Sequence, residues 1–316
     1  HYGGAPGVAQ YGAPPQGAAG QYGAPPMQGG PSSNAGTVTG VLQNKLRQMI
    51  QVNRLEAFYP PNSPQLNQLF ATVDRVDFKA MAQRYNMPLE LATDMVTLAM
   101  YDVVIFCDDS GSMAFEEGGE RVNDLKVILG RVAEVATQFD HNGINIRFMN
   151  GNVEGNNIRD SASASSLVSQ VQFNGLTPLG SKLDEKVIRP FVAGPVQSRS
   201  LQKPILVIVI TDGEPTGEPP NTVLNVIKGI KNLVSNSQYG PGAVGIEFSQ
   251  VGKDQGAQRF LATLDKDPQV GKMIDATSYY ELEQEEYARK GVTLTPDLWL
   301  MKLMVGAVDP TFDEQD

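Results

Sequence analysis

A polar segment directly after a strand-length apolar run restricts what this chain can fold into more than any other feature. The apolar run covers residues 103–107, and it is followed by Asp108-Asp109-Ser110-Gly111-Ser112. A second apolar run, residues 204–210, ends in Thr211-Asp212-Gly213. If the two runs are neighbouring strands of a parallel sheet, their carboxyl ends place these side chains around one crevice, where open α/β sheets bind ligands.

The side chains at this crevice offer oxygen atoms to a ligand. Asp108, Ser110 and Ser112 stand at alternate positions after the first strand, and Asp212 follows the second. Hard cations such as Mg²⁺, Ca²⁺ and Mn²⁺ prefer oxygen ligands, whereas zinc and copper sites use nitrogen and sulfur. The sequence therefore predicts Mg²⁺, or Ca²⁺ or Mn²⁺, at this crevice.

From residue 100 onwards, apolar runs alternate with amphipathic segments. We expect strands at 103–107, 144–149, 204–210, 243–251 and 272–275, with a turn or hairpin at 150–157. Helices are expected at 121–139, 163–170, 179–191, 222–235, 256–264, 279–289 and 296–308. This alternation predicts an α/β fold with a doubly wound, mostly parallel sheet that is flanked by helices.

Composition divides the chain into four segments. Residues 1–36 are rich in Gly, Pro and Tyr, with a repeated Gln-Tyr-Gly-Ala-Pro-Pro, and we expect this low-complexity tail to be disordered. Residues 37–99 are expected to form a helical extension, with helices at 41–55, 65–85 and 89–99. Residues 100–308 form the predicted α/β domain, and residues 309–316 an acidic tail.

Charge and cysteine content exclude several classes of protein. The formal net charge is −10 and the sequence pI is about 4.8, which argues against nucleic-acid binding. The longest apolar runs have the length of strands, so we expect no membrane insertion. The chain has one cysteine, Cys107, and therefore no internal disulfide. We expect a cytoplasmic protein, since the sequence shows no signal peptide.

Five positions in the predicted order resemble the metal-ion-dependent adhesion site of von Willebrand factor A domains. They are Asp108, Ser110, Ser112, Thr177 in a Gly-Leu-Thr-Pro-Leu segment, and Asp212. The resemblance covers roughly residues 100–308. It implies a Rossmann-like domain that binds another protein through a divalent cation, without catalysis.

The resemblance also implies a role for each position. Ser110 and Ser112 would bind the cation through their hydroxyls, and Thr177 directly or through water. Asp108 and Asp212 would hold waters and the serine hydroxyls. Neutral hydroxyl ligands leave the positive charge of the cation poorly quenched, so an Asp or Glu of a protein partner could complete its coordination.

Structural interpretations of the same residues remain open. Ser110 and Ser112 can form a turn and N-cap, Asp212 can belong to a common Asp-Gly turn, and Thr177 can cap a helix that starts near residue 179. We interpret Asp109 and residues 116–120 as solvated loop acids, and the acidic residues of 281–286 as the wet face of a helix.

Two other functions compete with adhesion. One is a structural protein that self-associates through its tail and helical extension. The other is a Mg²⁺-dependent hydrolase, although His141 is expected at the opposite edge of the sheet and a phosphatase general acid is missing where Ser110 stands. Residues 175–182 nearly copy a phosphate-binding loop, but Ser181 precedes Lys182 and Pro178 removes a backbone donor, so we reject nucleotide binding there.

Overall fold

The computed structural model describes residues 36–309 of the chain, without the side chains of residues 36–39 and 272. Almost all of the predicted tail at 1–36, and residues 310–316 of the predicted acidic segment, therefore lie outside the described residues. None of the described helices is long and apolar enough to cross a membrane.

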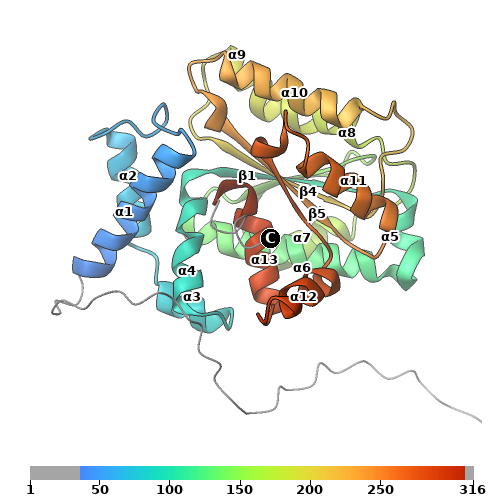
Figure 1. The fold of residues 1–316 in the computed structure, drawn as a ribbon, viewed down its shortest axis with the longest axis horizontal. Coiled ribbons are helices and arrows are strands. Elements are labelled where there is room, and N and C mark those ends of the chain that lie inside the picture. Colours follow the sequence, from blue (N-terminus) through green and yellow to red (C-terminus); the bar gives the residue numbers. More distant parts are fainter. Residues whose placement is uncertain (1–35, 310–316) are drawn as a thin grey trace, which may run out of the picture.

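A six-stranded sheet forms the centre of the fold (Figure 1). Its strands are β1 (Asp102–Cys107), β2 (Ile144–Phe148), β3 (Glu154–Ile158), β4 (Ile205–Thr211), β5 (Val244–Gln250) and β6 (Ile274–Thr277). Their order is β3-β2-β1-β4-β5-β6, and every neighbouring pair is parallel except β2 and β3. The predicted α/β fold with a doubly wound, mostly parallel sheet is thereby confirmed, and the segment at 150–157 is part of a hairpin.

Apart from Asp102, the two central strands consist of β-branched and other apolar residues, as expected where both faces of a strand are covered. All seven residues of β4 are buried, and five of the six residues of β1 are buried. Such continuous apolar runs are typical of parallel strands between two layers of helices.

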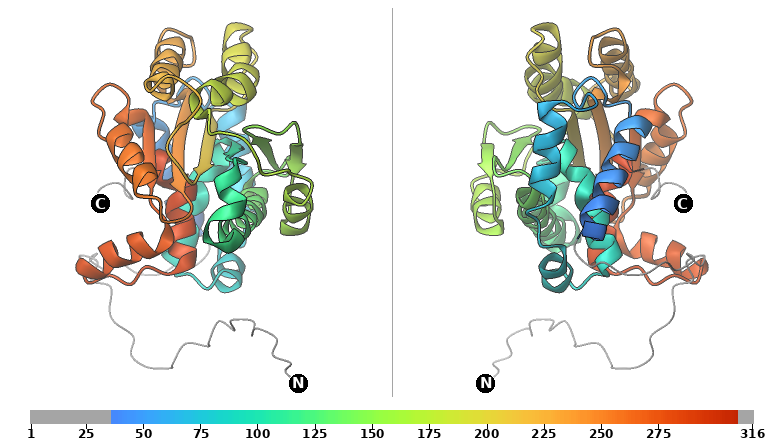
Figure 2. Two further views of the ribbon diagram at one scale, coloured as in Figure 1. Left: turned by 90° about the vertical axis from the view of Figure 1, so that its right-hand side faces the viewer. Right: turned by 90° about the vertical axis from the view of Figure 1, so that its left-hand side faces the viewer.

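Helices cover both faces of this sheet (Figures 1 and 2). The longer ones are α6 (Glu120–Phe139), α7 (Ser161–Val168), α10 (Thr222–Ser235), α11 (Gln255–Asp265), α12 (Tyr280–Arg289) and α13 (Pro296–Val305). Shorter segments are α5 (Gly111–Phe115), η2 (Glu116–Gly119), α8 (Leu179–Leu183), η3 (Asp184–Ala193), α9 (Gly194–Gln197), η4 (Pro241–Ala243), η5 (Gly271–Met273) and η6 (Gly306–Val308). Helices α6, α7 and α13 lie on one face, and α8 and α10 lie on the other.

The helix expected at 179–191 differs from the structure in its second half. It begins as α8 and continues as η3, which is a π-helix with Pro190 inside it. Proline has no N–H for the usual ladder of hydrogen bonds, so a local change of helical pitch around Pro190 is a physical reason for the difference.

The N-terminal helices pack on the domain through buried side chains. They are α1 (Gly36–Val52), α2 (Pro64–Val73), α3 (Phe78–Arg84), α4 (Leu89–Asp94) and η1 (Met95–Met100). The ring of Phe58 stacks on Tyr239 with 5.2 Å between centroids, and the Tyr59 hydroxyl donates to the Met100 carbonyl at 2.5 Å. The prediction of one helix over 65–85 was wrong, because Asp77 caps a new helix by accepting a hydrogen bond from the Ala80 N–H.

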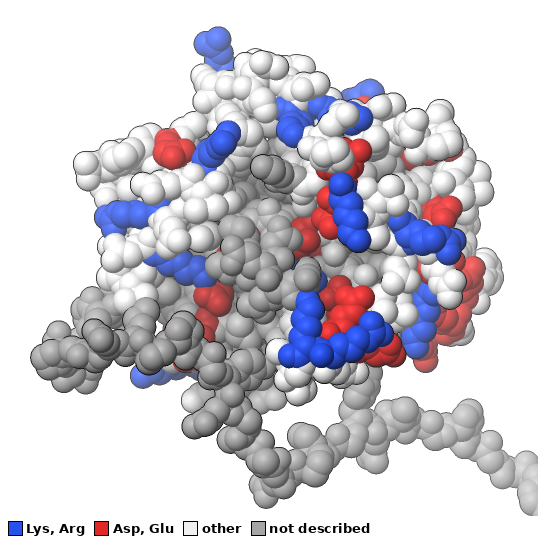
Figure 3. Space-filling model, viewed as in Figure 1, with Lys and Arg blue, Asp and Glu red and all other residues white. Residues whose placement is uncertain are grey.

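Acidic and basic side chains are interspersed on the face seen in Figure 3. Trp299 of α13 is buried, with 8% of its surface exposed, and its indole N–H donates to the Ser278 carbonyl at 2.8 Å.

Candidate metal-binding site

The pairing of β1 with β4 brings the two predicted polar segments together. Cys107 lies opposite Ile210 at the ends of the two strands, and the Asp108 N–H donates to the Ile210 carbonyl at 2.8 Å. The segments that follow these strands therefore leave the same edge of the sheet side by side. The predicted convergence of Asp108 and Asp212 depends on this register.

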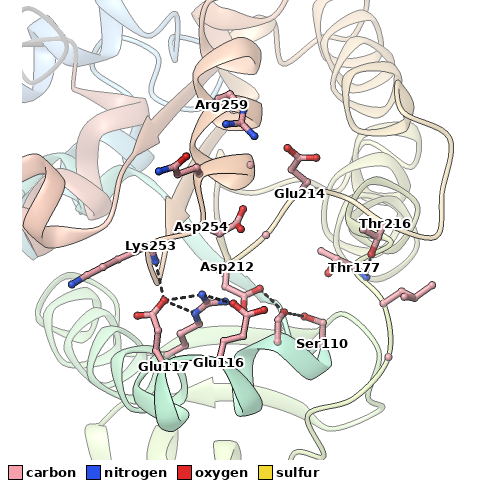
Figure 4. A pocket seen from close by; sticks show the side chains of 17 residues that line it. Ser110, Glu116, Glu117, Thr177, Asp212, Glu214, Thr216, Lys253, Asp254 and Arg259 are labelled. Carbon is pink, nitrogen blue, oxygen red and sulfur yellow. Dashed lines mark hydrogen bonds and ion pairs between the residues drawn. The ribbon is translucent and has the colours of Figure 1, made fainter.

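Four of the five predicted site residues form one hydrogen-bonded network, and Figure 4 shows the part of it between Ser110 and Asp212. Asp108 accepts from the Ser110 N–H at 2.8 Å and from the Thr211 hydroxyl at 2.7 Å. The Ser110 and Ser112 hydroxyl oxygens are 3.0 Å apart, and the Ser112 hydroxyl donates to Asp212 Oδ1 at 3.0 Å. The two carboxylates thus hold the two serines from opposite ends of the network.

Thr177 lies on an adjacent loop that hydrogen bonds connect to the site. The Gly111 N–H donates to the Gly175 carbonyl at 3.2 Å. Gly175 has a φ of +95°, which a residue with a Cβ rarely adopts. The Thr177 N–H donates to the Thr216 hydroxyl at 2.9 Å, and the Thr216 N–H donates to the Thr177 carbonyl at 2.9 Å. Thr177 lines the same cavity as Ser110, although its hydroxyl is not part of the network above.

The hydroxyls of the site do not cap helices. Ser110 is the N-cap residue of α5, yet its side chain makes no capping hydrogen bond. Pro178, not Thr177, is the N-cap residue of α8, and that cap has no side-chain hydrogen bond either. The capping roles considered for Ser110 and Thr177 are therefore not present in the structure.

The two aspartates of the site are buried in close proximity. Both have an exposed surface of 0%. Burial and the nearby charge of Asp212 raise the pKa of Asp108 to about 6. Burial also raises the pKa of Asp212, against hydrogen bonds from Arg121 and Ser112 that lower it. A buried pair of carboxylates has a strong electrostatic preference for a nearby positive charge.

Arg121 supplies part of that charge, and the sequence analysis did not identify it. Its guanidinium is buried and pairs with Asp212 at 2.7 Å, and with Glu116 and Glu117 at 2.7 Å each. Burial acts to lower the pKa of Arg121, but hydrogen bonds to Asp212 and Glu117 raise it above its usual range. The four-residue spacing from Glu117 to Arg121 on the chain was the available sequence signal.

The loop glutamates Glu116, Glu117 and Glu120 are exposed, as expected, but two of them also pair with Arg121. Besides its contact with Arg121, Glu117 accepts a hydrogen bond from the Lys253 N–H at 3.0 Å. The segment after α5 is therefore fastened to the loop after β5. The expectation was wrong only in leaving Glu117 without a partner, because Lys253 lies far from it in the sequence.

The interpretation of Asp109 as a solvated loop acid was also wrong. Asp109 is fully buried, and its carboxylate accepts from the N–H groups of Asn150 at 2.6 Å and Gly151 at 2.7 Å. Its carbonyl accepts from the Asn174 N–H at 2.8 Å. Asp109 therefore connects the loop after β1 with the loops after β2 and α7.

A cavity of about 980 Å³ opens beside the network. Ser110, Ser112, Thr177, Asp212 and Arg121 line it, together with residues from the start of α11. Within residues 36–309, no three His, Cys, Asp or Glu side chains converge to hold a metal by themselves, so a metal at this site would need hydroxyl ligands as well. Two adjacent serine hydroxyls beside two buried carboxylates fit a hard cation such as Mg²⁺.

Comparisons with known proteins find similar chains among solved structures only. No protein-family model matches the chain, and no curated protein matches it. Among solved structures, the chain is similar to one described as the crystal structure of the SpRpn10 VWA domain, with 13% sequence identity and a TM-score of 0.37. That match covers 65% of this chain and 94% of the other chain. A likeness at this level assigns neither a family nor a function, and the fold described above rests on the strand topology of the chain itself.

Proposed function

We propose that this chain is a protein-interaction module that binds an Asp or Glu side chain of a partner through a divalent cation, Mg²⁺ or else Ca²⁺ or Mn²⁺. The observation that carries the proposal is the pair of hydroxyls of Ser110 and Ser112, which lie 3.0 Å apart at a cavity wall. Asp212 accepts from the Ser112 hydroxyl, and Asp108 accepts from the backbone N–H of Ser110. Neither hydroxyl caps a helix through its side chain. Side chains held in this way are preorganised for an external ligand.

Each residue of the chain has a defined part in this proposal. Ser110 and Ser112 would hold the cation through their hydroxyl oxygens, and Thr177 faces the same cavity. Asp212 has Ser112 on one carboxylate oxygen and Arg121 on the other, which suits a residue that positions a ligand. A bound divalent cation supplies a positive centre with a coordination position that a partner's carboxylate can occupy.

Exposed apolar side chains beside the site support a protein as the ligand. Phe115, at the end of α5, is 82% exposed, and Leu176, next to Thr177, is 61% exposed. Leu176 lines the cavity. The Phe115 ring lies close to Gly111, between the two serines of the site, because a methyl group added to Gly111 would be 3.8 Å from it. Large apolar groups that remain in water next to a polar site are typical of binding surfaces.

The competing functions have weaker support. Self-association through the tail depends on residues 1–36, nearly all of which lie outside the described residues. For hydrolysis, His141 is exposed in the loop before β2, at the opposite edge of the sheet from the cavity. We therefore propose binding without catalysis.

A random-peptide display library, selected in Mg²⁺ with elution by EDTA, tests this proposal. We expect enrichment of peptides that contain Asp or Glu, and loss of their capture by Thr177→Val. Thr137→Val is the matched control, because the Thr137 hydroxyl bonds to the carbonyls of Ala133 and Arg159, away from the cavity. Phe115→Ser should weaken capture without changing the uptake of Mg²⁺.

Capture that survives EDTA, or that shows no preference for acidic peptides, would contradict the proposal. Equal loss of capture in Thr177→Val and Thr137→Val would also contradict it. In that case the loss would reflect the fold and not the site.

A further inference from the structure

A second, smaller cavity of about 170 Å³ lies between the first turns of α6, the loop after β5 and the start of α12. Pockets for small-molecule ligands usually measure about 300–1,000 Å³. The size of this cavity therefore suits one side chain. It is next to the candidate metal site, because Glu117 and Lys253 line both cavities.

The wall of this cavity carries acidic groups that the protein itself hardly neutralises. Glu120 and Asp124 of α6 have no ion-pair partner in the described part of the chain. Glu281 pairs with Lys253 at 3.4 Å, but both side chains are more than half exposed, so this pair is weak. Burial, followed by the charges of Glu281, Glu120 and Glu117, raises the pKa of Asp124 to about 6.

A buried hydrogen-bond acceptor on the cavity wall lacks a donor. Gln250, at the end of β5, has an exposed surface of 0%. Its Nε2 donates to the carbonyls of Gly252 at 3.1 Å and Asp254 at 2.9 Å, which fixes the orientation of the amide. Its Oε1 has no hydrogen-bond partner among residues 36–309. Because buried acceptors are normally satisfied, this oxygen points to a donor supplied from outside.

Aromatic rings complete the lining. Tyr279 and Tyr280 stand at the start of α12, and Trp299 comes from α13. The rings of Tyr280 and Trp299 pack edge to face with 6.2 Å between centroids. Aromatic faces attract organic cations, and the attraction grows when the cation is partly desolvated.

We propose that this cavity binds one cationic side chain, an ammonium or guanidinium group, of a partner protein. Carboxylates attract the cation, Gln250 Oε1 accepts one of its N–H groups, and the aromatic rings contact its apolar stem. A metal ion fits less well, because no three acidic or other ligating side chains converge here within the described residues. The site needs no metal, so it stands independently of the function proposed above.

The fluorescence of Trp299, the only tryptophan of the chain, reports directly on this cavity. The full chain would be titrated with n-butylammonium or n-propylguanidinium chloride at constant ionic strength, with EDTA present throughout. We expect a saturable change with at least one of the two cations, and none with n-butanol. Amide NMR shifts of Tyr279 and Gln250 provide a second measurement if the fluorescence is unresponsive.

Asp124→Asn should weaken this binding about tenfold, which corresponds to about 1.4 kcal/mol. Asp124 is exposed enough for the variant to fold, and its melting temperature checks this. Glu286→Gln is the matched control, because it removes the same charge from an exposed position of α12 outside the cavity.

Three outcomes would overturn the inference. They are the absence of saturable binding by both measurements, equal binding by Asp124→Asn and the unaltered chain, and an equal loss in Glu286→Gln. Because EDTA is always present, none of these outcomes bears on the candidate metal site.

Discussion

Arg121 is the residue on which the charge balance of the candidate metal site depends. It is 3% exposed and lies between Asp212, which is fully buried, and the glutamates of η2. A buried ion pair contributes little beyond what its desolvation costs, but removal of one partner leaves the other charge uncompensated. The arginine therefore matters most for keeping Asp212 ionised in its buried position.

Arg121→Met should lower the free energy of unfolding by about 3–5 kcal/mol, because it leaves Asp212 buried without its strongest partner. Urea unfolding followed by circular dichroism measures the difference.

Arg289→Met is the control for this substitution. Arg289 pairs with Glu285 on the surface, and their side chains are 71% and 69% exposed. Loss of such a pair should change the stability by less than about 1 kcal/mol. Similar effects of the two substitutions would contradict the role given to Arg121.

Sequence could predict the site residues that follow strand ends, and it missed those with distant partners. Asp108, Ser110 and Ser112 are recognisable because they follow an apolar run at alternate positions. Asp109 has the same neighbours in the sequence, but its partners Asn150 and Gly151 are brought to it by the pairing of β1 with β2. No local pattern distinguishes a buried acceptor of this kind from a solvated acid.

At the scale of elements, the junction of β5, β6 and η6 contains a buried acidic group. Glu247 of β5 accepts from the Thr277 hydroxyl at 2.8 Å and from the Ala307 N–H at 3.2 Å. Burial and the nearby Asp275 raise the pKa of Glu247 well above its usual value of 4.5. Over a range of pH above 4.5, the folded protein therefore keeps a proton that the unfolded chain loses.

This difference in protonation makes the fold less stable as the pH rises. Above about pH 4.5 the unfolded chain binds fewer protons at this position than the folded chain, so the contribution of Glu247 falls with pH until its folded pKa is passed. Glu247→Gln cannot lose a proton. Its stability relative to the unaltered chain should rise with pH, by up to about 1.4 kcal/mol per pH unit.

Urea unfolding at several pH values above about pH 5 measures this slope. Glu286→Gln, at an exposed position of α12, should leave the slope of the unaltered chain unchanged. Parallel curves for Glu247→Gln and the unaltered chain would show that Glu247 has the same affinity for protons in both states.

Helix α12 shows why the exposed face of an element is hard to predict from charge alone. Its acidic residues were expected to lie in water, but Glu283 is 3% exposed and accepts from the Lys302 ammonium of α13 at 3.0 Å. The expectation was therefore wrong for Glu283. The packing of α12 on α13 determines that Glu283 is buried. The spacing of charges within α12 contains no information about that neighbouring helix.

At the scale of the whole molecule, the order of strands and helices was predictable from residue 100 onwards. The alternation of apolar runs and amphipathic segments is a local property, and all of the strands expected from it are present in the sheet.

The packing of α1 to η1 on the domain was not predictable in detail. Contacts such as the Asn53 amide donating to the Val308 carbonyl, at 2.6 Å, join opposite ends of the described chain.

The proposed function requires that the hydroxyls after β1 hold a divalent cation. Isothermal titration of the full chain with MgCl₂, CaCl₂ and MnCl₂ measures this directly. We predict saturable uptake of at least one of these ions at millimolar concentration or below, lost in the double variant Ser110→Ala with Ser112→Ala. Ser169→Ala, whose hydroxyl bonds only to the Ser165 carbonyl of α7 among the described residues, should bind as the unaltered chain does. No uptake of any of the three ions, or undiminished uptake by the double variant, would contradict the account.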